Sequence, residues 1–518
     1  MNRPRQHNDT PLPEDFIRRI REQFPDSHDG FIDALDLPPR TSIRVNPHKW
    51  NHIRPKRDLP GEPVPWSVNG RFLDERPSFT FDPLFHAGAY YVQEASSMFL
   101  EYVLSRLANR SNSGILDGME RSPGIILDAC AAPGGKSTLL ASLFPEALIL
   151  ANEVIRSRMP PLIENSIKWG TGNIAVTQNE ASHFSSLPGF FDLILTDAPC
   201  SGEGLFRKDP GARLQWSADN ANHCSLRQRS ILTGLWPALK QGGFMVYTTC
   251  TFNPEENERN VAWLLGETGG ECVRIDLPDD SSNGSSGIRE ISGNKVTGYG
   301  FYPHRTPGEG FFLSVIRKSG HDQNHVQTQS QANAQHDMHS RSSGTARHPA
   351  RTQKRKRVKT GSRSRQAEGR ASLVQSADPA VINNSAKWFT GSDVAWYQIR
   401  ERLFRIRSSH YDTLQHLSDV LTVRYAGTEA GRIVRNEVLP APAAALNIHL
   451  NPESFPQIDC SSDEALRFLR RENLSVPVKA KPGWHLVMYD GLPLGWTKNI
   501  GSRMNNYHPS EWRIRKTS

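Results

Sequence analysis

Two cysteines in this chain stand where a thiol could do chemistry. Cys200 lies in "TDAPCSGEGLFRK", three residues after Asp197 and just past a mostly apolar run. Cys250 directly follows another apolar run, "FMVYTT". A cysteine can act as a nucleophile or a metal ligand when it is a thiolate, and a buried thiol can simply fill space. The residues around each cysteine decide among these interpretations.

The surroundings of the two cysteines favour a nucleophile over a metal ligand. The six cysteines in 518 residues form no CxxC pair, so we expect neither a disulfide framework nor a metal site. Asn253, Pro254 and Glu256 predict that a helix starts shortly after Cys250. Because a helix N-terminus lowers the pKa of a nearby thiol, Cys250 is the predicted thiolate. Cys200 has no such signal directly behind it.

The elements that must position these cysteines alternate between strands and helices. A helical pattern covers Ser225–Leu239, and apolar runs predict strands at Ile125–Leu127, Ala147–Leu150, Leu193–Leu195 and Phe244–Tyr247. This alternation predicts a doubly wound, Rossmann-like α/β sheet. The carboxyl ends of its parallel strands line one crevice, so the polar residues and cysteines that follow these strands should meet there.

The loop after the first of these strands predicts a site for a nucleoside-like cofactor. It reads "IILDACAAPGGKSTLL", where small residues and two glycines let a ligand approach the backbone ahead of a helix. A P-loop would need glycine where Cys130 stands, which opposes a nucleotide hydrolase. Glu153 ends the second strand, where a carboxylate accepts hydrogen bonds from ribose hydroxyls. A ribose contact without a phosphate loop favours S-adenosylmethionine.

The positive charge of the chain is concentrated in one segment. The net charge is +8, and residues 319–370 alone carry eleven Lys/Arg and three Asp/Glu. This segment has no aromatic residue, so we predict a disordered linker. Its basic residues favour a role in binding phosphates, and an import signal and an inert spacer are the alternatives. No apolar run reaches about 18 residues. The N-terminal residues also show no secretory signal, so a cytoplasmic protein is expected.

Three long motifs resemble those of the Sun-type RNA (cytosine-C5)-methyltransferases. They are "DACAAPGGKS" at 128–137, "DAPCSGEGLFRKDP" at 197–210 and "YTTCTFNPEENE" at 247–258, in the order of the family. The segment "YYVQEASSM" at 90–98 resembles the family's sequence ahead of its core. The tail at 494–515 is similar to the PUA-like end of the bacterial RsmF/YebU group, which modifies small-subunit (16S) ribosomal RNA.

The resemblance implies a role for each residue that matches a family motif. Cys250 is implied as the nucleophile that adds to cytosine C6, and Cys200 as the residue that assists product release. Asp197 is implied between cofactor and base, with Lys136 facing the base or the cofactor. The implied S-adenosylmethionine-binding residues are Cys130, Ala131, Ala132, Pro133, Gly134, Gly135, Lys136, Glu153, Asn179 and Asp197.

One position departs from the family pattern. The family usually has an aspartate near the adenine, and Asn179 stands at that position here. An asparagine can still form a hydrogen bond, but it lacks the charge. Either Asn179 or the neighbouring Glu180 is therefore expected to contact the cofactor.

The implied architecture is a Rossmann-like methyltransferase core with a small N-terminal α/β domain and a C-terminal PUA-like, β-rich domain. The expected parts are an N-terminal RNA-binding lead-in domain at 1–115, the core at 116–318, the basic linker at 319–379, a first C-terminal domain at 380–440 and the PUA-like RNA-binding domain at 441–518. We expect a monomer whose partner is ribosomal RNA, naked or in a small subunit or its precursor, with no membrane and no metal.

Other functions stay open on the sequence. A tRNA cytosine-C5 methyltransferase would share the same motifs. A non-catalytic RNA-binding module on a methyltransferase fold is opposed by the intact cysteines and glycine loop. Arg207 and Lys208 follow Cys200 closely and are suited to phosphates that flank a target base, or else form a solvated pair of loop charges.

Overall fold

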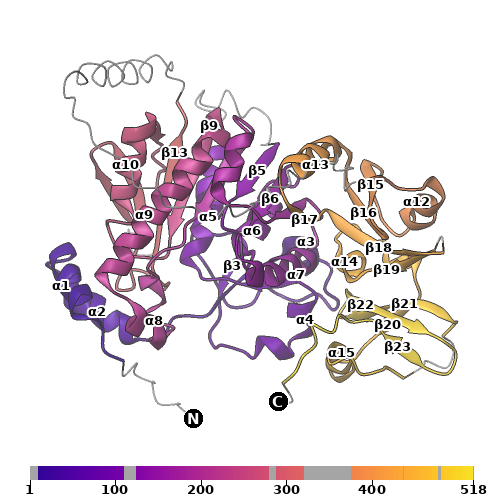
Figure 1. Ribbon diagram of the computed structural model, residues 1–518. Helices are drawn as coiled ribbons and strands as arrows, with labels where there is room; N and C mark the ends of the chain where they lie inside the picture. Colours follow the sequence, from indigo (N-terminus) through magenta and orange to yellow (C-terminus); the bar gives the residue numbers. More distant parts are fainter. Residues whose placement is uncertain are drawn as a thin grey trace, which may run out of the picture.

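The computed structural model describes residues 10–109, 124–278, 287–319, 375–435, 437–475 and 480–516. The predicted basic linker falls almost entirely outside these residues. Figure 1 shows the described parts packed side by side, with the two N-terminal helices at one end and the C-terminal strands at the other.

The centre of the protein is one sheet with the strand order β11-β12-β13-β9-β8-β5-β6-β7-β17, in which β10 also pairs with β13. Strands β5 to β9 run parallel to their neighbours among themselves, whereas β13 and β17 pair antiparallel at the two sides. The bounds are β5 Ile125–Asp128, β6 Leu148–Asn152, β7 Ile174–Thr177, β8 Phe191–Asp197, β9 Leu239–Thr249, β10 Glu271–Cys272, β11 Arg289–Gly293, β12 Val296–Phe301, β13 Phe311–Arg317 and β17 Val423–Ala426. The predicted doubly wound α/β core is confirmed.

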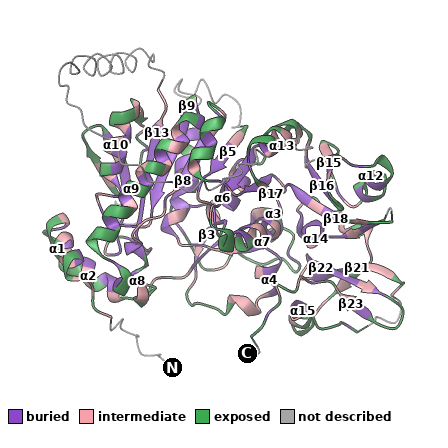
Figure 2. Ribbon diagram, in the orientation of Figure 1, coloured by how far each residue is buried: buried purple, intermediate pink, exposed green. Residues whose placement is uncertain are grey.

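Helices cover the sheet, so its central strands are buried on both faces. Parallel strands in this position are nearly continuous apolar runs, as "LILAN" in β6 is. Figure 2 shows the consequence: buried strands inside, and helices with exposed outer faces. The covering helices and the short helices beside them are α5 Phe99–Asn109, α6 Gly135–Leu143, α7 Met159–Trp169, α8 Pro210–Gln215, α9 Ala218–Leu235 and α10 Glu258–Thr268.

The helix predicted at Ser225–Leu239 is shifted. α9 begins seven residues earlier because the side chain of Ser217 caps it by accepting a hydrogen bond from Asn220 N. It ends before Pro237, and Leu239 already opens β9. The apolar residues at helical spacing do lie in α9, but the last residue of the predicted range belongs to β9.

The N-terminal part combines two helices with a small sheet of order β2-β3-β1-β4. Phe16 and Ile20 lie on one face of the first helix and are fully buried. They join a cluster with Phe206 and Phe252 from the loops of the central sheet, so these helices lie against the α/β core. The bounds are α1 Glu14–Gln23, α2 His28–Asp36, β1 Ser42–Val45, α3 Pro47–Trp50, β2 Glu62–Pro63, β3 Gly70–Phe72, α4 Pro83–His86 and β4 Tyr90–Val92.

The C-terminal part forms two further sheets, of order β14-β15-β16-β18-β19 and β20-β21-β22-β23. Its strand β17 leaves these sheets and extends the central sheet beside β7. The C-terminal part is therefore joined to the core through backbone hydrogen bonds. The bounds are β14 Gln375–Ser376, α12 Pro379–Ala386, β15 Val394–Ile399, β16 Arg402–Arg407, α13 Ser408–Val420, β18 Thr428–Val434, β19 Glu437–Pro440, α14 Pro442–Leu446, β20 Gln457–Asp459, α15 Ser462–Leu469, β21 Gly483–Tyr489, β22 Leu492–Asn499 and β23 Met504–Asn506.

Candidate active site at the carboxyl ends of the central strands

The loop that follows β5 lines a cavity of about 180 Å³. Gly134 has a φ of +110°, in the left-handed region that favours glycine, immediately before α6 begins. A Cβ at Gly135 would lie 3.1 Å from Tyr91, another lining residue, so glycine keeps this space open. The other lining residues are Val92, Gln93, Glu94, Ser97, Cys130, Ala131, Ala132, Pro133, Lys136 and Asp197.

The residues that end β6 and β7 lie beside this loop. Glu153 is buried; its Oε1 accepts a hydrogen bond from Ile155 N at 2.8 Å, and its Oε2 pairs with Arg158 Nη1 at 3.3 Å. Asn179 is also buried, and its Oδ1 accepts a hydrogen bond from Thr422 N at 3.0 Å. Asn179 Nδ2 has no hydrogen-bond partner in the described part of the chain, so a donor is left for a ligand.

The structure brings the two cysteines together. The Sγ atoms of Cys200 and Cys250 lie 3.1 Å apart, and both residues are free thiols. The hydrogen bond to Cys250, together with burial, raises the pKa of Cys200 well above its ordinary value. The contact between the two sulfurs therefore favours the thiol form of Cys200.

Lys136 and Asp197 form an ion pair next to the cysteines. Lys136 Nζ lies 2.8 Å from Asp197 Oδ2, and Thr248 Oγ1 donates a hydrogen bond to Asp197 Oδ1 at 2.9 Å. Burial lowers the pKa of Lys136, but Asp197 outweighs it and the pKa lies above its ordinary value. The charge of a Cys250 thiolate adds to this rise, which places the ion pair and the cysteine in one site.

The predicted helix start after Cys250 is wrong. Residues 254–257 form a turn, and α10 begins at Glu258. The Glu256 carboxylate does not cap a helix: it accepts hydrogen bonds from Ser201 N at 2.9 Å, from Ser201 Oγ and from Gln228 Nε2 at 2.9 Å. Cys250 therefore does not lie at the N-terminus of a helix. The two thiols differ because the pKa of Cys200 is raised.

Glu256 is a site residue that sequence reasoning misassigned. It is fully buried, and burial raises its pKa to about 7. Through Ser201 it ties the residue after Cys200 to the turn that follows Cys250. The signal that could have found it is the second of the two adjacent glutamates in "FNPEEN", but a capping box explains the same letters equally well.

Asp128 is a second residue that the sequence analysis left without a role. It ends β5, is fully buried, and its Oδ2 accepts a hydrogen bond from Ser137 Oγ at 2.6 Å. Burial raises its pKa to about 7, and Oδ1 has no hydrogen-bond partner among the described residues. Burial and this carboxylate also raise the pKa of Cys130, which stays a thiol.

Arg207 is not free to bind phosphates as predicted. Its guanidinium donates hydrogen bonds to the carbonyl oxygens of Leu37, Pro38 and Gly308, at 3.1, 3.3 and 2.7 Å. It therefore joins the N-terminal part to the core, whereas Lys208 is exposed. The described residues contain no group of three potential metal ligands and no helix long and apolar enough to cross a membrane.

Sequence models of three families match the chain in order. They are the N-terminal domain of 16S rRNA methyltransferase RsmF at residues 12–95, 16S rRNA methyltransferase RsmB/F at 116–317 and the methyltransferase RsmF PUA domain at 455–514. The chain is thus similar to the RsmB/F methyltransferases in its central part and to RsmF near both ends. The PUA model falls on β20 to β23, and the N-terminal model on α1 to β4.

Curated relatives carry the name ribosomal RNA small subunit methyltransferase F. The protein of Pectobacterium atrosepticum is 36% identical over 322 residues, which are 60% of this chain and 63% of that protein. The proteins of Aliivibrio fischeri and Escherichia coli are also 36% identical, over 331 and 325 residues. The matched region thus spans less than two thirds of these relatives, 63 to 65% of their length.

Two of the solved structures that the chain matches come from Pyrococcus horikoshii. A methyltransferase homolog from Pyrococcus horikoshii has a TM-score of 0.47 and 28% identity, over 59% of this chain and 95% of that one. The NSun6 structure from the same organism has a TM-score of 0.44 and 20% identity, over 60% of this chain and 99% of that one.

Proposed function

We propose that this protein transfers a methyl group from S-adenosylmethionine to C5 of cytosine in 16S ribosomal RNA, through a covalent bond between Cys250 and cytosine C6. The observation that carries the proposal is the cysteine pair, with Sγ atoms 3.1 Å apart, beside the Lys136–Asp197 ion pair. A thiol pair and a cation–carboxylate pair at one sheet edge are what a nucleophilic attack on a pyrimidine ring requires.

The cavity beside the β5 loop fits the proposed cofactor. The small residues Ala131, Ala132 and Gly135 leave the backbone of the β5 loop accessible from the cavity. A Cβ at Gly135 would reduce the space beside Tyr91. Asn179 Nδ2 is a buried donor without a partner in the described chain, suited to an acceptor nitrogen of adenine. Glu153 would accept hydrogen bonds from the ribose hydroxyls, and Arg158 would then move away from the Glu153 carboxylate. Glu180 is exposed, so Asn179 is the better candidate for the adenine.

Cys250 starts the proposed reaction. Its thiolate adds to C6, forms the S–C6 bond and pushes the electron pair of the C5=C6 bond into the ring, which makes C5 nucleophilic. When bound, the cofactor supplies an electrophilic methyl group on a sulfonium sulfur. C5 would take this methyl group as its bond to the sulfonium sulfur breaks and a neutral thioether leaves, so the ring would carry both the methyl group and the C5 proton.

Asp197, Lys136 and Cys200 handle charge and protons in this scheme. Asp197 is held by Lys136 and Thr248, so within the ion pair Lys136 carries the proton and donates toward N3, while the Asp197 carboxylate accepts from the exocyclic amine. The hydrogen bond to Cys250 that raises the pKa of Cys200 is lost once the Cys250 sulfur is bonded to C6. Cys200 then gives its proton to solvent, and its thiolate takes the proton from C5. The S–C6 bond then breaks and returns Cys250 to a thiolate.

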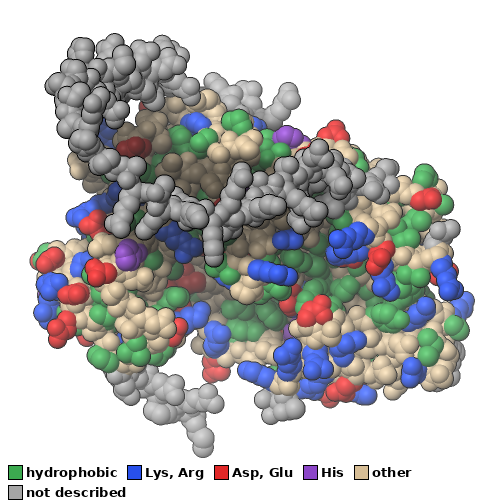
Figure 3. All heavy atoms as spheres, in the orientation of Figure 1, with side chains coloured by type: hydrophobic (Ala, Val, Ile, Leu, Met, Phe, Trp, Pro, Cys, Tyr) green, Lys and Arg blue, Asp and Glu red, His purple; other side chains and the backbone are tan. Residues whose placement is uncertain are grey.

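The proposed substrate follows from the relatives and from the C-terminal part. The relatives are named for the small ribosomal subunit, and the PUA family model matches the last sheet. Figure 3 shows Lys and Arg side chains gathered over the lower right of one face, where Figure 1 places the C-terminal strands. A basic surface of this kind binds RNA phosphates. Ribosomal RNA as the substrate implies that the protein acts in the cytoplasm.

Trapping of the covalent intermediate tests the mechanism. Purified protein is incubated with S-adenosylmethionine and 16S ribosomal RNA and run on a denaturing gel. Cys250→Ser should give no protein–RNA adduct, and Cys200→Ala should accumulate it. Cys460→Ser, a half-buried cysteine of the C-terminal part, is the matched control and should behave as the unmodified protein. An adduct in Cys250→Ser but not in Cys200→Ala would invert the assignment.

Mapping of 5-methylcytosine tests the substrate. Bisulfite sequencing of total RNA from cells with and without the gene should show a site lost from 16S ribosomal RNA. Loss of a tRNA site with unchanged ribosomal RNA would replace the substrate and leave the chemistry standing.

A further inference from the structure

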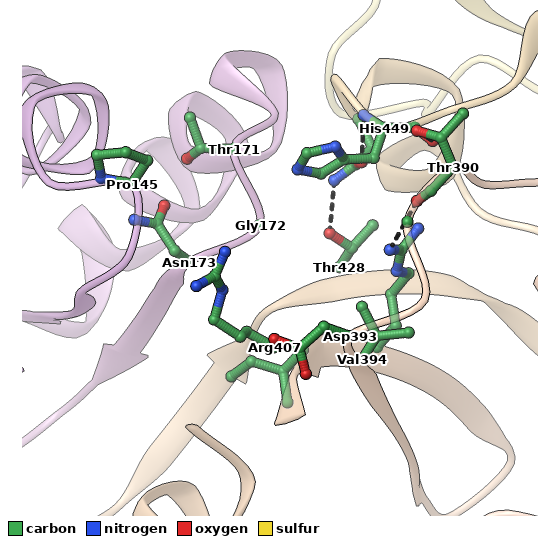
Figure 4. Close-up of a pocket in the computed structure, with 14 residues that line it drawn as sticks. Pro145, Thr171, Gly172, Asn173, Thr390, Asp393, Val394, Arg407, Thr428 and His449 are labelled. Atoms are coloured by element: carbon green, nitrogen blue, oxygen red, sulfur yellow. Dashed lines mark hydrogen bonds between the residues drawn. The ribbon is translucent and has the colours of Figure 1, made fainter. Parts of the chain in front are cut away.

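A second cavity of about 160 Å³ lies between the methyltransferase core and the C-terminal part. Its core wall is the turn before β7, including Thr171 and Asn173, and its other wall includes Arg405 on β16. Figure 4 shows the labelled side chains of both walls converging on one space. Gly391 and Asp393 are exposed, so the cavity opens to solvent at their side. No step of the proposed reaction uses it.

Arg405 lines this cavity with an unmatched charge. Arg405 is only 5% exposed, and its guanidinium lies over the ring of Phe389, 4.4 Å from the ring centroid. Nη2 donates to Thr390 O at 3.3 Å, whereas Nη1 is buried and has no hydrogen-bond partner in the described chain. None of the described carboxylates forms an ion pair with Arg405, unlike Arg407, which pairs with Glu146. A buried cation without an anion is costly unless a ligand supplies one.

The opposite wall offers two more unsatisfied groups. Thr171 Oγ1 and Asn173 Oδ1 are buried and have no hydrogen-bond partner among the described residues. Asn173 cannot turn its amide toward the cavity instead, because Nδ2 donates to the carbonyl oxygens of Ala147 and Phe144, at 3.1 and 3.2 Å. The cavity therefore presents a cation, a hydroxyl and a carbonyl acceptor.

The electrostatics around Arg405 favour an anion. Burial lowers the pKa of Arg405 only to about 10, so the guanidinium is charged at neutral pH. His449, also in the lining, has its pKa lowered by burial and then by Arg405 and Arg407, which shows that the cations dominate there. The Asp393 carboxylate stands at the exposed rim, where water screens it.

We propose that this cavity binds one nucleotide backbone unit of RNA, with Arg405 Nη1 and the Thr171 hydroxyl donating to a phosphate and Asn173 Oδ1 accepting from the neighbouring ribose 2′-hydroxyl. The inference rests on the proposed function in taking RNA as the ligand. At about 30 Å³ per water, the cavity has room for a phosphate and a ribose edge, while the base stays outside. The 2′-hydroxyl is a donor that DNA and inorganic phosphate lack, and Asn173 needs a donor.

RNA binding measured without catalysis tests the site. We would titrate the purified full chain with a single-stranded RNA from 16S ribosomal RNA, the DNA of the same sequence, and inorganic phosphate as competitor, at several salt concentrations. Arg405→Met keeps the stem over Phe389 and should raise the RNA Kd about tenfold or more and reduce the salt slope by about 0.7. Thr171→Val, which leaves Arg405 in place, should raise the Kd a few-fold without changing the slope.

Arg432→Met is the matched control because it removes an exposed arginine from the adjacent strand β18. Its effect on the Kd should be smaller than that of Arg405→Met. Unchanged RNA Kd and slope in both Arg405→Met and Thr171→Val would overturn the site, whether or not methylation works. Equal affinity of the unmodified protein for the RNA and for the DNA of the same sequence would overturn the 2′-hydroxyl contact. If Arg405→Met abolished competition by inorganic phosphate but left the salt slope of RNA binding unchanged, RNA would be overturned as the ligand of this cavity. Failure of the unmodified protein to bind any RNA would overturn the proposed function as well.

Discussion

Replacing Glu256 by glutamine should change how the stability of the protein depends on pH. The carboxyl group is fully buried between Ser201 and Gln228, and its pKa lies at about 7 in place of the ordinary 4.5. Between these two values the folded protein holds a proton that the unfolded chain has already released. The free energy of unfolding therefore falls as the pH rises through this window.

The size of the effect follows from the same two values. A rise in pKa from 4.5 to about 7 costs the folded state about 3 kcal/mol at high pH, of which about 2.5 kcal/mol falls between pH 5 and pH 8. Glu256→Gln cannot ionise and should lose this dependence. Its amide faces donors from Ser201 and Gln228, which should cost about 1–3 kcal/mol at both pH values.

Urea unfolding at pH 5 and pH 8, followed by tryptophan fluorescence, measures the difference. Relative to the unmodified protein, Glu256→Gln should gain about 2.5 kcal/mol on going from pH 5 to pH 8. Glu267→Gln removes an exposed carboxylate from α10 and should gain nothing comparable. If the unmodified protein and Glu256→Gln lose the same stability over this range, the Glu256 carboxyl is not the buried, proton-binding group described here.

Three further changes probe the site, the N-terminal contact and the linker. Lys136→Met should lower kcat about 100-fold if the ion pair acts on the base, whereas a raised KM for the cofactor with unchanged kcat would mean that Lys136 holds the cofactor carboxylate. Arg19→Ala removes the ion-pair partner of the buried Glu203, whose Oε2 lies 2.7 Å from Arg19 Nη2. It should lower the free energy of unfolding by about 3 kcal/mol in thermal unfolding, against less than about 1 kcal/mol for Arg18→Ala, which changes an exposed arginine. Deleting residues 319–370 removes a charge of +8 and should weaken RNA binding and flatten its salt dependence; identical salt slopes would refute a phosphate-binding linker.

Much of the fold could be predicted because the local signals are strong. The apolar runs at β5, β6, β8 and β9 are short, continuous and bounded by turns, which is the pattern of a buried parallel sheet. The boundaries of the helices are harder to predict than the strands. Ahead of α10 the letters of a capping box stand in a turn, where the Glu256 carboxylate accepts hydrogen bonds from Ser201 N, Ser201 Oγ and Gln228 Nε2 instead of capping a helix.

The residues along the chain were enough to predict that Cys200 and Cys250 follow two strands of one sheet, and hence that they converge. They were also enough to predict the glycine loop and the acidic end of β6, because these depend on residues near one another in the chain. The raised pKa of Cys200 is a property of the tertiary structure, since it depends on a contact of 3.1 Å between two sulfurs 50 residues apart. The same holds for the Thr422 contact to Asn179 and for the buried Arg405: pairings between distant segments set burial and unmet hydrogen bonds, and no local pattern encodes them.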